Sequence, residues 1–409
     1  NYAEMGIGSG FGGNVCFDRI YSCRSNSLHK KEKKDMIVNK PPMGWNTWNT
    51  FMEDIDEEKV KASADALAAS GLDKAGYNYL VIDDGWSEKR RDSNGRLVPD
   101  KKRFPNGMKS LSDYVHSKGL KFGMYSDVGN WTCALYPGSY QFEYIDAQTF
   151  AEWGVDFLKY DYGNKPMGTH GKLLYRRMGA ALATCGRDIL FSACSWGTDE
   201  THEWIKTTGA HMWRSTHDLF NSWESLNDIA RSQVALQPYN GQGCFNDMDM
   251  LIVGLHDTKL PGDGCNDTEY KTHFALWCVL GSPLMIGGDI RDMKKEHIEL
   301  LSNKELIKID QDEAYRQAFL ASYGPDIPVW VRMLSNGDYA IGLFNLTDEE
   351  GRAQFCLPDL GIDRSTGKTL QLKNVFTGEE KTVYNGIYAE FLKPHDCTVF
   401  RAKIVPESF

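Results

Sequence analysis

The stretch FLKYDYG at residues 157–163 contains the features that point to the fold of this chain. Apolar residues lead into it from Gly154 and Val155, Asp161 stands near its end, and Gly163 breaks the pattern. A buried parallel strand that ends at a working carboxylate has this form, because both of its faces are covered and its carboxyl end opens to the site. We therefore place the centre of a predicted site at Asp161.

Seven other short apolar runs alternate with helical or loop-plus-helix segments. Helical spacing is clear at 57–69 and 108–118, and a further helix is expected around 147–153. Alternation of strand and helix over roughly 250 to 280 residues is the size and rhythm of a (β/α)8 barrel. We therefore predict an α/β fold with a (β/α)8 TIM barrel and its active groups at the carboxyl ends of the strands. The predicted strands lie at 43–48, 79–86, 121–127, 156–162, 189–196, 211–218, 244–251 and 282–289.

The pattern changes after about residue 316, where short β-like runs are broken by turn signals such as Asn336-Gly337. These runs predict a small antiparallel β domain. The glycine-rich start of the chain lacks the preceding strand and following helix of a nucleotide-binding fingerprint. The predicted division is an N-terminal extension of unknown role at 1–36, the catalytic barrel at 37–316 and a C-terminal β domain at 317–409.

Composition narrows the class of function. The 409 residues carry a formal charge of -10 and 12% aromatic residues, which argues against binding to nucleic acid. The 11 Trp and 19 Tyr suit a protein that binds sugar rings, although most are expected in the core. No apolar window is long enough to span a membrane.

The cysteines bear on the compartment. Ten cysteines without CxxC spacing argue against a zinc site and against a dense disulfide framework. We expect a reducing, cytoplasmic location, or secretion if a leader was removed.

Acidic and basic residues stand at the ends of the predicted strands. Glycoside hydrolysis needs two carboxylates in different environments, one that attacks the sugar or activates water and one that protonates the leaving oxygen. Asp161 lies two residues from Lys159, whose charge should favour the ionised carboxylate of a nucleophile. Asp218 follows Arg214 on a predicted loop, where exposure suits an acid that later serves as a base. The full set comprises Asp83, Asp84, Asp127, Lys159, Asp161, Arg214, Asp218, Asp247, Asp249 and Asp289, with the aromatic residues Trp45, Trp86 and Tyr125.

A single aspartate after a strand is a weak signal, since it often only caps the next helix. We expect Asp127 and Asp289 to be of that kind. Asp161 and Asp218 stand apart because too many acids converge on one predicted face for helix caps alone. The Asp and His residues show no HxxxH or paired-acid pattern of metal ligands, so we expect neither a metal nor another cofactor.

Five motifs in order resemble glycoside hydrolase family 27, which contains the α-galactosidases and α-N-acetylgalactosaminidases. The motifs are PMGWNTW at 42–48, IDDGW at 82–86, KYD at 159–161, WR at 213–214 followed by Asp218, and NDMDML at 246–251. The resemblance covers about residues 40 to 320 and implies a (β/α)8 barrel with a C-terminal antiparallel β-sandwich. It also implies a retaining glycosidase without a metal, acting on a small-molecule or glycan substrate with a terminal α-galactosyl group.

The resemblance also implies roles for individual residues. Asp161 matches the nucleophile and Asp218 the acid/base, with about 5 to 5.5 Å expected between their carboxyl groups. Asp83 and Asp84 match the pair that holds the 4- and 6-hydroxyls of galactose. The remaining expected substrate-binding residues are Trp45 as an aromatic wall, Tyr125 beside the nucleophile, Lys159, Arg214, Asp249 and Ser195.

The motif Cys194-Ser195-Trp196 leaves the substrate open. Many α-galactosidases have Glu at the position of Ser195, on the sugar 2-hydroxyl, whereas a serine resembles the animal α-N-acetylgalactosaminidases. We expect an α-galactosidase, with an α-N-acetylgalactosaminidase as the alternative. A β-L-arabinopyranosidase and a non-catalytic sugar-binding protein are weaker alternatives, because Asp83 and Asp84 favour the larger sugar and both catalytic carboxylates are present.

The cysteine pattern differs from that of the animal members. They have cysteines where Gly85 and Gly163 stand, so Cys133 lacks the family's disulfide partner. This supports a microbial enzyme in a reducing compartment. A homo-oligomer is possible.

Overall fold

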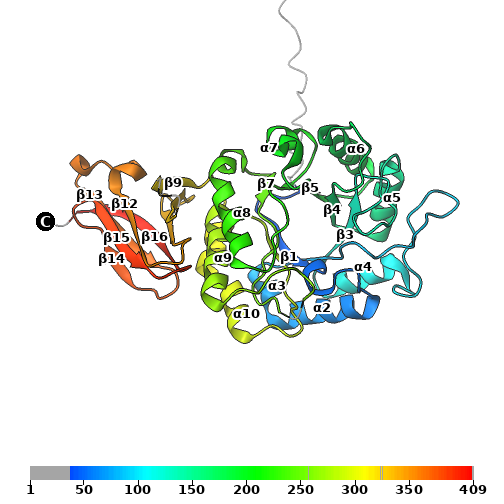
Figure 1. Cartoon of the computed structure of the whole chain (residues 1–409), viewed down its shortest axis with the longest axis horizontal. Helices are drawn as coiled ribbons and strands as arrows, with labels where there is room; N and C mark the ends of the chain where they lie inside the picture. Colours follow the sequence, from blue (N-terminus) through cyan, green and yellow to red (C-terminus); the bar gives the residue numbers. More distant parts are fainter. Residues whose placement is uncertain (1–36, 257, 323, 325, 408–409) are drawn as a thin grey trace, which may run out of the picture. The chain divides into compact units, whose positions relative to one another are not determined.

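Eight parallel strands form one sheet in the order β7-β6-β5-β4-β3-β2-β1-β8, with helices on its outer face (Figure 1). The structure is a computed structural model that describes residues 37–407 except 257, 323 and 325, so the predicted extension at 1–36 lies outside the described residues. The predicted (β/α)8 barrel is confirmed. Its strands are β1 (Met43–Asn46), β2 (Tyr79–Val81), β3 (Lys121–Asp127), β4 (Phe157–Asp161), β5 (Leu190–Cys194), β6 (Met212–Arg214), β7 (Phe245–Asp247) and β8 (Leu284–Ile286).

The helices begin and end at residues suited to those positions. The Asp56 carboxylate accepts a hydrogen bond from the Lys59 N–H (2.8 Å) at the start of α2, and Gly71 ends that helix with a φ of 83°. Asn266 and Glu269 form a capping box at the start of α9. The helices are α1 (Trp48–Phe51), α2 (Glu57–Ser70), α3 (Leu72–Ala75), α4 (Gly107–Ser117), α5 (Glu143–Trp153), α6 (Gly171–Thr184), α7 (Thr201–Trp204), α8 (Trp223–Leu236), α9 (Asp267–Leu280), α10 (Lys295–Leu301) and α11 (Lys304–Asp310).

Alternation along the strands explains how the barrel interior changes from apolar to polar. Successive side chains of a strand point to opposite faces, so every second residue faces the interior. In β4 these are Phe157, Lys159 and Asp161. Phe157 packs in an apolar cluster with residues of the other strands, and Lys159 and Asp161 line the polar end above it. The carboxyl ends of the strands therefore hold the ionisable groups, as predicted.

The barrel closes by an irregular seam. β7 ends at Asp247, and the contact with β8 is made later by Leu251, which forms a parallel bridge with Ile286. The Leu251 N–H donates to the Met285 carbonyl (2.7 Å), and the Gly287 N–H donates to the Leu251 carbonyl (2.9 Å). Between Asp247 and Leu251, Asp249 has a left-handed φ of 81°. The predicted continuous strand at 244–251 is therefore wrong, because the backbone leaves and rejoins the sheet within it.

Other strands are shorter than predicted. β2 ends at Val81, so Asp83 and Asp84 stand on the loop that follows it. The run at 43–48 is a strand only to Asn46, and α1 begins at Trp48. Apolar and aromatic residues continue past the strand ends because they pack against the barrel rim, and this continuity hides the point where the strand stops.

The C-terminal part forms an antiparallel β-sandwich, as predicted. Its own apolar core includes Val331, Ile341, Phe355 and Phe400, which lie between a six-stranded and a two-stranded sheet. The strand orders are β14-β13-β16-β11-β10-β9 and β12-β15. The strands are β9 (Phe319–Ser322), β10 (Val329–Met333), β11 (Tyr339–Phe344), β12 (Gly351–Cys356), β13 (Lys368–Asn374), β14 (Glu380–Thr382), β15 (Ile387–Leu392) and β16 (Cys397–Pro406).

His395 connects this sandwich to the barrel helices. Its ring stacks on Trp223 of α8 at 4.2 Å between centroids, and its Nδ1 lies 2.7 Å from an oxygen of Glu269 in α9. The Thr272 hydroxyl donates to the His395 carbonyl (2.7 Å). The two sheets are therefore anchored on α8 and α9. Among the described residues, no helix combines the length and the apolar character that a membrane crossing requires.

Candidate active site

A cavity of about 220 Å³ opens at the carboxyl ends of the barrel strands. It brings together residues at or just after the ends of β1 to β6 and residues of the loops after β6 and β7. Eight of the ten residues predicted to bind or transform the substrate line it, while Trp45 and Ser195 do not. The eight are Asp83, Asp84, Tyr125, Lys159, Asp161, Arg214, Asp218 and Asp249.

The two oxygens of Asp161 have different surroundings. The Tyr125 hydroxyl donates to Oδ2 (2.8 Å), whereas Oδ1 is buried and has no hydrogen-bond partner among the described residues. Burial raises the pKa of Asp161, and the charge of Lys159 lowers it without compensating fully. The expected influence of Lys159 is therefore present, but burial outweighs it.

Lys159 and Asp83 form a buried ion pair on the cavity floor. The Lys159 ammonium lies 2.8 Å from Oδ2 of Asp83 and above the ring of Tyr125. Asn46 donates to the same Asp83 oxygen (2.8 Å). Burial would lower the pKa of Lys159, but the charges of Asp83 and Asp161 raise it well above its usual range. The floor therefore keeps a fixed positive charge between two carboxylates.

Asp84 is held by the loop that follows β3. The Thr132 hydroxyl and the Gly85 N–H donate to Oδ1 (2.9 and 2.8 Å), and the Ala134 N–H donates to Oδ2 (2.9 Å). Burial raises the pKa of Asp84 to about 6 despite these donors. Three donors from two loops fix its position, which suits a residue that orients a polar ligand.

Arg214 links the carboxylates on the opposite side. Its Nη2 lies 2.8 Å from Oδ1 of Asp218 and 3.0 Å from Oδ2 of Asp249. The side chain of Asp218 is 56% exposed, as expected for an acid/base, whereas Arg214 is buried. Restricted hydration at the cavity mouth raises the pKa of Asp218, but the charges of Arg214 and Lys159 outweigh this and hold it below its usual range.

The predicted role of Trp45 is wrong. This side chain is fully buried, its indole N–H donates to the Gly288 carbonyl (2.8 Å), and its ring packs edge-on against Phe51. In β1 the adjacent Asn46 faces the interior, so Trp45 must face the helices. The aromatic residue of this motif that lines the cavity is Trp48, on α1.

The structure does not bring Ser195, a predicted sugar contact, to the cavity. Ser192 and Cys194 face the barrel interior, whereas Ser195 follows the end of β5 and is not among the residues that line the cavity. Its hydroxyl lies 2.5 Å from that of Thr201, and the side chain is fully buried. Trp196, the next residue, returns to the cavity wall. The identity of residue 195 therefore acts on packing behind β5 and has no direct contact with the cavity.

Several other strand-end acids have structural positions. Asp127 is buried and accepts hydrogen bonds from the N–H groups of Gly129 (2.7 Å) and Gly163 (2.9 Å), which fixes two loops rather than capping a helix. Asp289 pairs with Arg291 (2.6 Å). Asp247 lies below the cavity, where burial raises its pKa to about 6.

Sequence reasoning missed some of the lining residues. Asn46 and Cys194 face the barrel interior next to Trp45 and Ser195, the residues that the motifs singled out instead. The loop residues Trp196, Phe220 and Met250 carry no periodic signal. Cys133 was recognised only as an unpaired cysteine, yet its sulfur lies 3.8 and 3.9 Å from carboxylate oxygens of Asp127 and Asp161. Burial raises its thiol pKa, so the thiol is neutral beside these acids.

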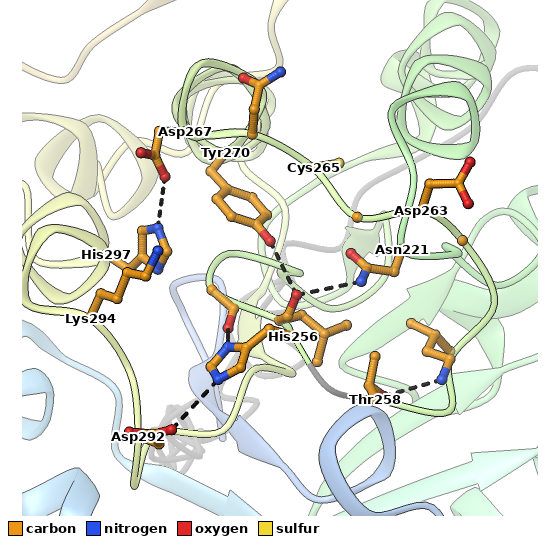
Figure 2. Close-up of a pocket in the computed structure, with 16 residues that line it drawn as sticks. Asn221, His256, Thr258, Asp263, Cys265, Asp267, Tyr270, Asp292, Lys294 and His297 are labelled. Atoms are coloured by element: carbon orange, nitrogen blue, oxygen red, sulfur yellow. Dashed lines mark hydrogen bonds and ion pairs between the residues drawn. The ribbon is translucent and has the colours of Figure 1, made fainter.

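A second and larger cavity, of about 800 Å³, lies beside the loop that follows β7 (Figure 2). His256 and His297 line it, and their rings pair with Asp292 and Asp267. It contains none of the predicted catalytic residues. In the part of the chain that the structure describes, no group of three or more His, Cys, Asp or Glu residues has an arrangement that could hold a metal ion.

The chain is similar to known glycosidases over most of its length. It is 40% identical to an α-galactosidase of Cyamopsis tetragonoloba over 361 residues, covering 88% of this chain and 85% of that protein. It is 44% identical to an α-galactosidase of Coffea arabica over 323 residues, covering 79% and 83%. The crystal structure of α-galactosidase I from Mortierella vinacea superposes with a TM-score of 0.82 at 29% identity, covering 91% of this chain and 98% of that one.

The family assignments divide the chain between the barrel and the C-terminal sandwich. The family described as Alpha galactosidase A matches residues 40–312, and the Alpha galactosidase C-terminal beta sandwich domain matches residues 324–402. The barrel, the sandwich and the paired carboxylates of the cavity agree with this assignment. The chain therefore belongs to the Alpha galactosidase A family, within glycoside hydrolase family 27, and is a glycosidase of the α-galactosidase type.

Proposed function

We propose that this protein removes terminal α-linked D-galactose from oligosaccharides or glycoconjugates by double displacement, with retention of configuration. The observation that carries the mechanism is the asymmetry of Asp161. Tyr125 holds Oδ2, while Oδ1 is buried without a donor. The Asp161 carboxylate is therefore held in one orientation at the cavity, from which it can attack the anomeric carbon.

Asp218 supplies the proton in this proposal. In the first step a carboxylate oxygen of Asp161 bonds to the anomeric carbon, the glycosidic bond breaks, and the Asp218 proton passes to the leaving oxygen. Arg214, 2.8 Å away, stabilises the Asp218 carboxylate that remains. In the second step that carboxylate takes a proton from water, whose oxygen displaces Asp161 and releases galactose. The lowered pKa of Asp218 suits this second step in particular.

Galactose is the sugar best supported by the cavity floor. Asp83 and Asp84 are buried, and the Lys159 side chain is only 15% exposed; all three are held by neighbouring groups and can exchange these hydrogen bonds for those of sugar hydroxyls. We assign Asp83 and Asp84 to the 4- and 6-hydroxyls. The alternative of an α-N-acetylgalactosaminidase rests on Ser195 alone. The Ser195 hydroxyl lies against that of Thr201, and the side chain does not line the cavity.

The stereochemistry of the product tests the mechanism. Proton NMR during hydrolysis of an aryl α-galactoside should show α-galactose first, followed by slow mutarotation to the β anomer. If β-galactose appears first, the enzyme inverts and Asp161 is a general base rather than a nucleophile. Mass spectrometry of a peptide that contains Asp161, after reaction with a slow fluorinated galactosyl substrate, should show the covalent adduct.

We further propose that the protein works in a reducing compartment. The eight cysteines of the described residues are free thiols, including Cys133 at the cavity. Fractionation of the source cells, with thiol labelling before and after reduction, tests this. Equal labelling in the two samples is expected, and a large gain after reduction would contradict it.

A further inference from the structure

One wall of the catalytic cavity is apolar, in contrast to its charged floor. Phe220, Leu260 and Pro261 line the cavity and form this wall, and Phe220 follows Asp218 by two residues. The Phe220 side chain is 45% exposed, and Pro261 is also exposed. An aromatic side chain left in contact with water at the mouth of a polar cavity is a candidate for ligand contact.

Backbone hydrogen bonds hold this wall in place. The Phe220 N–H donates to the Ser225 hydroxyl (2.9 Å), and the Asn221 N–H donates to the Pro261 carbonyl (2.8 Å). At Gly262 the φ is 129°, and a Cβ there would lie 2.2 Å from the Asn221 carbonyl oxygen, so only glycine allows this approach. The loop after β7 is thus docked against the segment that carries Asp218, and Phe220 and Pro261 have fixed positions.

The chemistry decides which part of a substrate meets this wall. Asp218 must approach the glycosidic oxygen in order to protonate it. The galactosyl ring occupies the polar floor beside Asp161, so the group beyond that oxygen extends along the side of Asp218. Phe220 is two residues further along the chain, on the same cavity wall. Its place in the cavity lining close to Asp218 makes it a candidate contact for the leaving group.

We propose that Phe220 and Pro261 bind the first sugar of a carbohydrate leaving group, and that the second cavity binds the sugars beyond it. This proposal rests on the proposed function and specifies its substrates as galactosylated oligosaccharides. The apolar C–H face of a sugar ring packs on aromatic and proline rings. Phe220 supplies this face, and the polar rim of the cavity remains available for the hydroxyls.

The second cavity lies where a longer leaving group would continue. Leu260 lines both cavities, and Asn221, the residue after Phe220, lines the second. This cavity has a volume of about 800 Å³, against about 220 Å³ for the catalytic one, so it has room for more than one ring. Its side chains include His256 and Lys294, polar groups that suit a neutral, hydroxyl-rich ligand (Figure 2).

Substrates of increasing leaving-group length test the proposal. The three probes are α-galactosyl fluoride, with no leaving sugar, an α-galactosyl-glucose disaccharide, with one, and raffinose, with two. For Phe220→Ala, the ratio of kcat/KM on the disaccharide to kcat/KM on the fluoride should fall about ten-fold. For His256→Ala, the ratio of raffinose to disaccharide should fall about three-fold, with the disaccharide-to-fluoride ratio preserved.

The controls separate this proposal from the function on which it rests. Phe220→Tyr keeps the aromatic face and should restore most of the disaccharide rate, and it replaces the alanine variant if that variant does not fold. If Phe220→Ala lowers all three rates equally, or none, the wall does not bind the leaving sugar. If His256→Ala leaves the raffinose-to-disaccharide ratio of kcat/KM unchanged, the second cavity does not bind the leaving group. Failure of the parent protein to hydrolyse the fluoride would instead overturn the proposed function.

Discussion

The catalytic cavity and the second cavity have similar residue types, but Asp161 in the first is far more buried than Asp267 and Asp292 in the second. Both contain several aspartates and at least one lysine, and the one without catalytic residues is the larger. In the catalytic cavity Asp161 is 6% exposed, and it accepts a hydrogen bond from the Tyr125 hydroxyl. In the other, the side chains of Asp267 and Asp292 are 85% and 87% exposed. Acids become chemically distinctive when water is removed from them, so volume alone does not identify a site.

Asparagine substitutions in the two cavities should give the largest contrast. Asp161→Asn removes the proposed nucleophile, and kcat on an aryl α-galactoside should fall about a thousand-fold or more. Asp292→Asn, the matched change at the exposed carboxylate, should alter kcat by less than about two-fold. Steady-state kinetics at one pH measures both. Comparable losses in the two variants would show that the burial contrast does not distinguish the sites.

A second test concerns the outer face of β5, which belongs to neither cavity. Ser195→Glu places a carboxylate where the side chain is fully buried, so the free energy of unfolding should fall by about 3 kcal/mol. The relative rates on aryl α-galactoside and aryl α-N-acetylgalactosaminide should stay the same, because residue 195 does not reach the cavity. Urea unfolding and paired kinetics measure the two effects. A reversal of sugar preference would show that residue 195 controls specificity after all.

Tyr125→Phe tests the hydrogen bond that makes the two oxygens of Asp161 unequal. Loss of a donor to a carboxylate costs about 1.5 to 3 kcal/mol, so kcat/KM should fall roughly 10- to 100-fold. The ionised form of Asp161 also loses stabilisation, so its pKa should rise and the acidic limb of the pH profile should move to higher pH. A profile that keeps its acidic limb in place would assign that limb to another group.

The smallest effect is expected from His273, an uncharged buried group outside both cavities. Burial lowers its pKa to about 3, and its Nε2 accepts a hydrogen bond from the Ile252 N–H (3.1 Å). A histidine in the unfolded chain titrates near 6.5, so its contribution to stability is complete above that pH and is lost as the pH falls. The loss should reach about 2 kcal/mol by pH 5.

His273→Gln keeps an acceptor but cannot gain a proton. The variant should therefore show a weaker fall in unfolding free energy between pH 7 and pH 5. His211, whose pKa burial lowers to about 4, remains in both proteins and should account for part of the remaining slope. Identical slopes in the two proteins would mean that His273 stays neutral when the chain unfolds or charges without cost when folded.

The sequence was sufficient for the architecture and for most of the cavity. β3 spans the predicted 121–127, and β4 (Phe157–Asp161) is one residue shorter at each end than the predicted 156–162. These strands have clear limits because polar residues bound their apolar runs. Where buried apolar and aromatic residues follow the strand end, as Ile82 and Trp86 follow β2, the sequence alone did not show where the backbone leaves the sheet.

The errors at Trp45 and Ser195 have a different cause. Both positions belong to recognised motifs, and a motif specifies residue types without specifying which face of the strand each occupies. The period of two would have corrected both, since Asn46 and Cys194 are their inward-facing neighbours. Contacts such as Arg214 with Asp249 join chain segments far apart in sequence, and no local pattern predicts their distance.

The irregular seam between β7 and β8 limits how this enzyme can change. Asp249 occupies the seam itself, two residues before the Leu251 bridge that completes the ring of strands. A substitution that moves Asp249 therefore also disturbs barrel closure, and activity and folding respond to the same few residues. Adaptation to new substrates should consequently accumulate in the docked loop at 258–264 and around Phe220, where side chains can vary without opening the barrel.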